Sequence, residues 1–165
     1  MPDELIRAFR FQVTLTRSAT GGGTGADPDS ERLGDGAFQE CSGLDLEVDV
    51  QDHLEGGRND GIVRRAGRVK LQPLVLKRGM LAGDDGARDE LWHWIQDVLA
   101  GVRPLRRYDG LVEVLTREGE DVVATWSFDR GLPVKLSGPQ LNARTGEIAI
   151  EELHIAHEGL TLAAG

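Results

Sequence analysis

The chain has 165 residues, 39% of them hydrophobic and 28% charged, which is the composition of one folded domain with a single core. The formal net charge of −9 argues against a surface built to bind nucleic acid, since phosphate binding needs clustered lysine and arginine. The single cysteine, Cys41, excludes an internal disulfide, and no apolar run approaches the roughly 18 residues of a membrane span. We expect one domain over residues 1–165. Residues 1–5 hold no apolar secretory segment, so we expect the protein to be synthesised in the cytoplasm and not inserted in a membrane.

The first predicted strand lies near the N-terminus. Phe9, Phe11, Val13 and Leu15 alternate with polar residues, and a period of two indicates a strand with one buried face. Residues 18–36 follow with six glycines, a proline and three apolar residues, too few to form a core. We therefore predict a flexible Gly-rich loop at 18–36.

The second predicted strand is amphipathic. From Leu44 to Gln51 apolar residues alternate with acidic ones, so one face is apolar and the other carries Asp45, Glu47 and Asp49. The polar segment from Leu54 to Ala66 contains repeated glycines. This composition predicts a long excursion or a loose hairpin.

Strand character returns from Val69 to Leu76, where Pro73 restricts the strand to an edge, a bulge or a bend. The next segment has helical periodicity instead. Leu91, Ile95 and Val98 fall at i, i+4 and i+7, which predicts one amphipathic helix of about 13 residues.

The C-terminal part is predicted to be strand again. Leu111–Thr116 and Val122–Arg130 flank a turn sequence that contains glycine, which indicates a hairpin. In the last strand Ile150 and Leu153 have opposite parity. Because a slip of one residue reverses the two faces of a strand, we predict a bulge or sharp bend at Glu151–Glu152.

About seven strands and one helix predict a mainly β fold: a small β-sandwich or partly open barrel, with the helix over an open end or edge. Neither an internal repeat nor a second domain is visible.

Five segments lie in order along the chain: Phe38–Leu44, Glu55–Asn59, Leu76–Gly79, Leu91–Trp94 and Glu151–Gly159. Through them the chain resembles the tail-tube protein family of contractile phage tails and extracellular contractile injection systems. The resemblance implies a structural protein without enzymatic activity or cofactors. It also implies rings of six copies, whose strands join into one larger barrel around a lumen, and stacking of these rings into a hollow conduit.

The same resemblance implies the partners: other copies of the chain, a sheath protein, baseplate and tube-initiator proteins, a tube-terminating cap, and a protein or DNA cargo in the lumen. The protein would be part of a phage tail or a phage-tail-like particle that is released from the cell. Two alternatives in the same class are a tube-initiating paralogue, which the long 18–36 loop mildly favours, and a type VI secretion tube component. A carbohydrate-binding β-sandwich is the alternative from another class, although Trp92 and Trp126 have the parity of buried residues.

No catalytic, cofactor-binding or metal site is predicted. Gly21–Gly25 precedes no helix and has no lysine, so it lacks the parts of a phosphate-binding loop. His154 and His157 are three apart and should point to opposite faces of a strand, and we expect both to face solvent or an interface. Ser42 lacks a nucleophile elbow, and Cys41 has no assignable base.

Two surface predictions rest on the tube hypothesis. The first is a contact between subunits or rings, at a segment whose glycines allow close approach and at a basic pair; its residues are Glu55, Gly56, Gly57, Arg58, Asn59, Lys77 and Arg78. The second is that Asp45, Glu47 and Asp49 face the lumen and repel polyanions. Salt bridges from these carboxylates within the subunit would contradict the second prediction.

Overall fold

The computed structural model describes the chain apart from residues 1–4, 8–9, 20–31, 37, 55, 58–59, 84–85, 88 and 165. The described residues form twelve strands and one helix. The elements are β1 (Phe11–Arg17), β2 (Arg32–Gly36), β3 (Glu40–Ser42), β4 (Leu46–His53), β5 (Val63–Leu71), β6 (Leu74–Gly79), β7 (Ala82–Gly83), β8 (Gly86–Ala87), α1 (Glu90–Leu99), β9 (Tyr108–Leu115), β10 (Val122–Ser137), β11 (Ile150–Ala156) and β12 (Gly159–Ala164).

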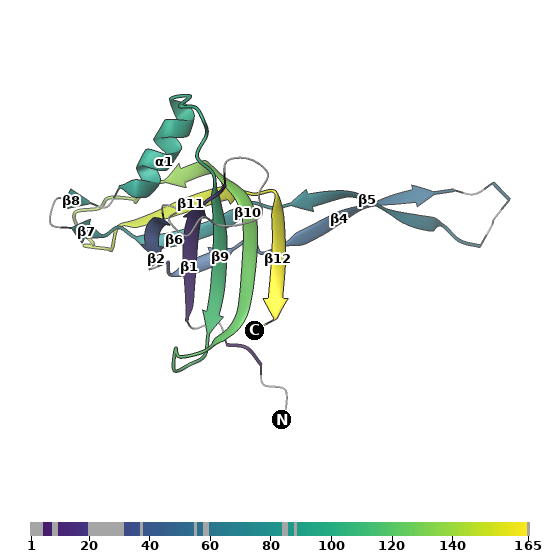
Figure 1. Cartoon of the computed structure of the whole chain (residues 1–165), viewed down its shortest axis with the longest axis horizontal. Helices are drawn as coiled ribbons and strands as arrows, with labels where there is room; N and C mark the ends of the chain where they lie inside the picture. Colours follow the sequence, from purple (N-terminus) through teal and green to yellow (C-terminus); the bar gives the residue numbers. More distant parts are fainter. Residues whose placement is uncertain are drawn as a thin grey trace.

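Two layers of strands share β10, which is 16 residues long (Figure 1). The first half of β10 pairs with β9 and β12, and its second half pairs with β11. The strand order is β2-β1-β9-β10-β11-β6-β3, with β12 beside β10, and the sheet does not close on itself. The predicted partly open β-sandwich with one helix is therefore confirmed. Short pairs such as β7–β8 raise the strand number above the predicted seven.

The core lies between the two layers. Leu15, Tyr108 and Phe128 from the first layer meet Leu76 and Ile155 from the second, and each is at most 1% exposed. β9 passes so close to Phe128 that a Cβ at position 110 would overlap its ring, and the residue there is glycine.

The hairpin of β4 and β5, named the arm below, pairs with no other described strand and projects away from the sandwich (Figure 1). The predicted excursion is thus a long hairpin with a register shift between Val48 and Val50, and its second strand begins at Val63. Pro73 stands between β5 and β6, where the chain leaves the arm and enters the sandwich. The sequence predicted an edge, a bulge or a bend at this proline, because its ring nitrogen cannot donate to a strand ladder, and the structure has a break between two strands there.

Helix α1 packs against one end of the sandwich through Leu91 and Trp94, which are buried as predicted. It has 10 residues rather than 13, and Gly101, with φ 73°, follows its C-cap. Trp94 Nε1 donates a hydrogen bond to the Arg106 carbonyl at 2.9 Å, and its ring meets Tyr108 edge-on. These contacts hold the segment after the helix against the first layer.

The predicted bulge at Glu151–Glu152 is wrong. β11 pairs with β6 in unbroken register from Ile150 to Ile155. Its inward residues are Glu151 and Leu153, whereas Ile150 is 41% exposed. The alternation along β11 is therefore regular: Glu151, Leu153 and Ile155 face the core, and the first of these inward residues is a glutamate.

A buried ion pair makes that carboxylate tolerable in the core. Arg78 Nε donates to Glu151 Oε1 at 2.5 Å, and Trp92 Nε1 donates to Glu151 Oε2 at 2.9 Å. Arg78 Nη1 also donates to Glu90 of α1 at 3.1 Å. The side chains of Arg78 and Glu151 are 2% and 1% exposed, so the network joins β6, β11 and the helix inside the protein.

The predicted loop at 18–36 is also partly wrong. Residues 32–36 form β2, which pairs antiparallel with β1, and Leu33 is buried in the core. One apolar side chain was enough to place this strand because β1 offers an open edge. Residues 20–31 lie outside the described part of the chain.

We predict that Arg78→Met lowers the free energy of unfolding by about 3–5 kcal/mol, because Glu151 would remain as a buried carboxylate without its cation. Urea unfolding measures this change. Lys77→Met is the matched control: it alters the neighbouring residue of β6, whose side chain is 37% exposed, and should change stability little. Equal losses of unfolding free energy for the two variants would contradict a stabilising role of the buried Arg78–Glu151 ion pair.

Candidate functional site

The arm carries an uncovered apolar face. Leu46, Val48 and Val50 lie on one side of β4, and Val69 lies opposite Val48 on β5. These four side chains are 65%, 47%, 63% and 58% exposed in the order named. Local periodicity predicted an apolar face on this strand, but no described element of the same chain packs against it. Contiguous exposed apolar surface of this kind marks a contact with another molecule.

The opposite face of the arm is charged. Lys70 Nζ lies 2.6 Å from Asp49 and 3.9 Å from Glu47, all within one subunit. Salt bridges within the subunit contradict the prediction that Glu47 and Asp49 face the lumen. Both carboxylates pair with Lys70 of β5, which neutralises part of this acidic row. Asp45 is exposed next to this row, and its place at a lumen stays a prediction.

The predicted contact segment falls at the turn of the arm. Gly56 and Gly57 form a turn, and Gly57 has φ +97°, a conformation that side chains other than glycine rarely adopt. No atom lies within 4 Å of a Cβ built at either position. Glu55, Arg58 and Asn59 lie outside the described residues, so the contact role of this segment stays a prediction.

The two residues of the basic pair on β6 differ: Arg78 is buried, whereas the side chain of Lys77 is 37% exposed and its contact role stays a prediction. Arg78 is enclosed in the core by the ion pair described above, so the prediction for it is wrong. Lys77 points to the other side of the strand and lies 3.1 Å from Glu40 and 3.7 Å from Glu152. The hydrogen bond and charge of Glu40, aided by Glu152, raise the pKa of Lys77 above its ordinary value. Both cations are thus engaged within the subunit.

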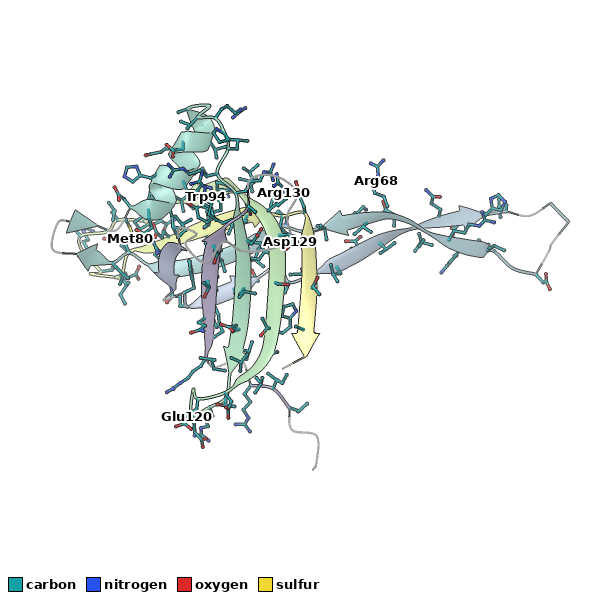
Figure 2. The ribbon with its side chains drawn as sticks, in the orientation of Figure 1. Arg68, Met80, Trp94, Glu120, Asp129 and Arg130 are labelled. Carbon is teal, nitrogen blue, oxygen red and sulfur yellow. The ribbon has the colours of Figure 1, made fainter. Side chains whose placement is uncertain are left out.

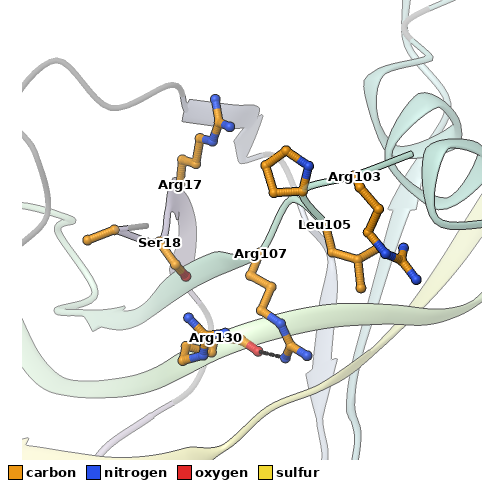
Figure 3. A pocket seen from close by; sticks show the side chains of 8 residues that line it. Arg17, Ser18, Arg103, Leu105, Arg107 and Arg130 are labelled. Carbon is orange, nitrogen blue, oxygen red and sulfur yellow. Dashed lines mark hydrogen bonds between the residues drawn. The ribbon is translucent and has the colours of Figure 1, made fainter. Parts of the chain in front are cut away.

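A basic cavity of about 420 Å³ lies at one end of the first layer (Figure 3). Arg17, Arg103, Arg107 and Arg130 line it, together with Ser18, Ala19, Pro104 and Leu105. Arg107 Nη1 donates to the Arg130 carbonyl at 3.1 Å, and Arg130 Nε lies 2.9 Å from Glu158. The sequence did not indicate this cluster, because its arginines come from distant segments of the chain.

The first layer also has a polar face turned away from the core. Strand pairing aligns Thr14, Leu111, Ser127 and Thr161 in one row across β1, β9, β10 and β12. The period of two along each strand places this row opposite the buried residues. The outer face of the sheet thus carries hydroxyl groups beside the carboxylates of Asp109 and Glu113 and the exposed Leu111.

The groups considered for chemistry are placed apart. Cys41 is partly buried, and burial raises its pKa from 9.0 to about 11, which keeps the thiol protonated. His154 Nε2 lies 2.5 Å from Glu152, and this contact, together with charge from Lys77, lowers the pKa of Glu152. His157 is 9% exposed and packs on Phe128, so the prediction that it faces solvent or an interface is wrong.

Two further searches concern ligands and membranes. Among the described residues, no three His, Cys, Asp or Glu side chains gather as they would around a metal ion. No helix in the described part of the chain is long and apolar enough to cross a membrane.

The model of one protein family, the T4-like virus tail tube protein gp19, matches residues 7–161. The chain belongs to this tail tube family. The family is structural, and its match spans both layers, the arm and the helix. No curated protein sequence matches the chain.

Solved structures share the fold. A chain of the PVC sheath–tube complex, from an extracellular contractile injection system in the extended state, has a TM-score of 0.77 at 20% identity, covering 99% of this chain and 95% of the other. A chain of the anti-feeding prophage tube-terminating cap has a TM-score of 0.77 at 19% identity, covering 100% and 95%. A type six secretion system protein is more distant, with a TM-score of 0.53 at 11% identity, covering 93% and 83%.

We predict that Cys41 alkylates about 100-fold more slowly in the folded protein than in urea at pH 8. A rise in pKa from 9.0 to about 11 lowers the thiolate fraction by that factor, and the thiolate is the nucleophile. Iodoacetamide labelling followed by intact mass measures both rates. Equal rates would contradict the buried, protonated state.

Proposed function

We propose that the chain is an inner-tube subunit that assembles into stacked hexameric rings and forms a hollow conduit through a contractile particle. The uncovered apolar face of the arm is the observation that carries this proposal. Membership of the tail tube family and the fold shared with a six-fold symmetrised baseplate structure support it.

Exposure of this apolar face to water is unfavourable for the isolated arm. Full burial of a valine or leucine side chain contributes about 1.5–3 kcal/mol, and four such side chains are only half covered. A partner that covers the face therefore gains several kcal/mol per copy. Because the arm projects beyond the sandwich, it reaches a neighbouring copy rather than its own core.

The open edges of the sheet favour closure into a ring. Among the described strands, β2 pairs with β1 alone and β12 with β10 alone, and unpaired strand edges attract further strands. Lateral contact between copies would join the first layers into one larger barrel. The row of Thr14, Leu111, Ser127 and Thr161 would then line the lumen, since it lies on the face of this layer that is turned away from the core.

Partners are proposed from the structures that share this fold. These come from a sheath–tube complex, a tube-terminating cap and a baseplate. We accordingly propose that a sheath, a cap and a baseplate with its tube initiator contact the assembled tube, which acts in a released phage-tail-like particle. Force transmission through stacked rings requires no catalysis, so the subunit acts as a structural protein and not as an enzyme.

We predict that the purified protein forms rings and stacked rings, and that Val48→Asp raises the concentration needed for assembly at least about tenfold. The new carboxylate would oppose burial of the apolar face. Negative-stain microscopy and mass photometry measure assembly. Gln51→Asp places the same charge on the opposite, polar face of β4 and should assemble normally.

Two outcomes would contradict the proposal. The first is a stable monomer at high concentration with no rings. The second is a Val48→Asp variant that assembles as well as Gln51→Asp, because the apolar face would then have no role in association.

We predict that Gly57→Val impairs stacking while urea unfolding of the sandwich stays unchanged. A β-branched side chain is strained at φ +97°, so the turn of the arm must rearrange. Gly56→Val is the control, since this glycine has no positive φ and equal free space. Full-length tubes from Gly57→Val would show that the shape of the turn is irrelevant to stacking.

A further inference from the structure

Opposite ends of the same strands carry complementary charge. At one end lies the basic cavity, lined by Arg17 from the end of β1, by Arg103 and Arg107 from the segment before β9, and by Arg130 from the middle of β10 (Figure 3). At the other end lies the β9–β10 turn, residues 116–121, which contains Glu118, Glu120 and Asp121. Figure 2 shows Glu120 and Arg130 at opposite ends of the layer.

Among the described residues, Glu158 is the carboxylate that pairs with Arg107 and Arg130 of the cavity, and Arg103 has no such partner. Glu158 forms ion pairs with two of the arginines, at 2.9 Å from Arg130 and 3.5 Å from Arg107. Asp109 accepts its described hydrogen bonds from the Arg130 backbone and from Ser18 rather than from a guanidinium. Among the described residues Arg103 pairs with no carboxylate, and its guanidinium donates only to the Val102 carbonyl at 3.5 Å.

The β9–β10 turn carries an excess of negative charge. Glu118, Glu120 and Asp121 are exposed, and within the described part of the chain none of their carboxylates forms an ion pair. Arg117 is in the same turn, and Arg10 donates to the Glu118 carbonyl oxygen at 3.2 Å. The turn itself therefore holds three carboxylates and one guanidinium group, that of Arg117, while Arg7 and Arg10 lie beside it from the N-terminal segment.

The shape of the turn keeps these carboxylates at the tip. Thr116 N donates to the Asp121 carbonyl at 2.8 Å, and Gly119 N donates to the Thr116 carbonyl at 2.9 Å. Gly119 has φ +81°, which closes the turn. The tip is thus a defined projection that continues the direction of β9 and β10 (Figure 2).

We propose that the turn of one copy docks in the basic cavity of a copy in the next ring, so that its carboxylates meet Arg103 and Arg130. Two different surfaces on opposite ends form a heterologous contact, which repeats without limit and gives a polar filament. Guanidinium groups bind carboxylates by charge-assisted hydrogen bonds, and like charges at the same ends disfavour head-to-head stacking. The contact rests on the stacked rings proposed above and sets their direction.

Charge reversal and its rescue test the contact. Arg103→Glu and Glu120→Arg should each raise the concentration at which rings stack at least about tenfold, because every copy in the ring repeats the repulsion. Each variant should still form rings. Combining both changes in one chain restores opposite charges across the contact, so the double variant should stack within about threefold of the unchanged protein.

Arg144→Glu is the control for net charge, since it makes the same change as Arg103→Glu at an exposed residue without a described ion pair. It should stack normally. Mass photometry counts rings, and sedimentation with microscopy measures tubes at low and high salt; salt should weaken stacking through screening.

The outcomes separate the two proposals. Rings without tubes for each single reversal, with tubes restored in the double variant, support the contact. Normal tubes from Arg103→Glu and Glu120→Arg would overturn the contact and leave the tube subunit proposal standing. Absence of rings from the unchanged protein would overturn the tube subunit proposal and, with it, the contact between rings.

Discussion

The whole architecture depends on one constraint, the passage of β10 from one layer to the other. The register of β10 with β9 breaks between Phe128 and Gly131, and Arg130 between them has φ 51°. A Cβ at position 131 would lie 2.8 Å from both Ile155 and the Tyr108 carbonyl, so only glycine fits there. Because a single strand serves both layers, this bend sets how they pack. It also presents Arg130 to the basic cavity.

The subunit combines a well-packed core with exposed apolar surface on the arm. Inside, apolar side chains and one satisfied ion pair stabilise the sandwich independently of any partner. Outside, the arm exposes apolar side chains, and strand edges stay unpaired. The core therefore does not depend on the exposed surfaces, which are left to contact other molecules. Apolar contact supplies affinity, whereas complementary charge at the two ends selects one polarity of stacking.

The buried ion pair shows where sequence reasoning fails. Parity along the last strand placed Ile150 inward, because isoleucine is usually buried and glutamate is usually exposed. The chain does the opposite: Glu151 is inward, since Arg78 and Trp92 satisfy its oxygens from elements more than fifty residues away. Likewise, nothing local indicated that Arg17, far along the chain from Arg103, lines the same cavity.

The sequence by itself determined the local features: the strands of period two, the position of α1, the hairpin of β9 and β10, and the family through its ordered segments. These follow from residue periodicity and turn chemistry, which act over a few neighbours. The tertiary structure alone decided which apolar faces are covered. The alternation in β4 is the same as in a core strand, yet its apolar face stays exposed. The physical reason is that burial depends on which elements pack together, and none of the elements that the structure describes packs on this face of the arm.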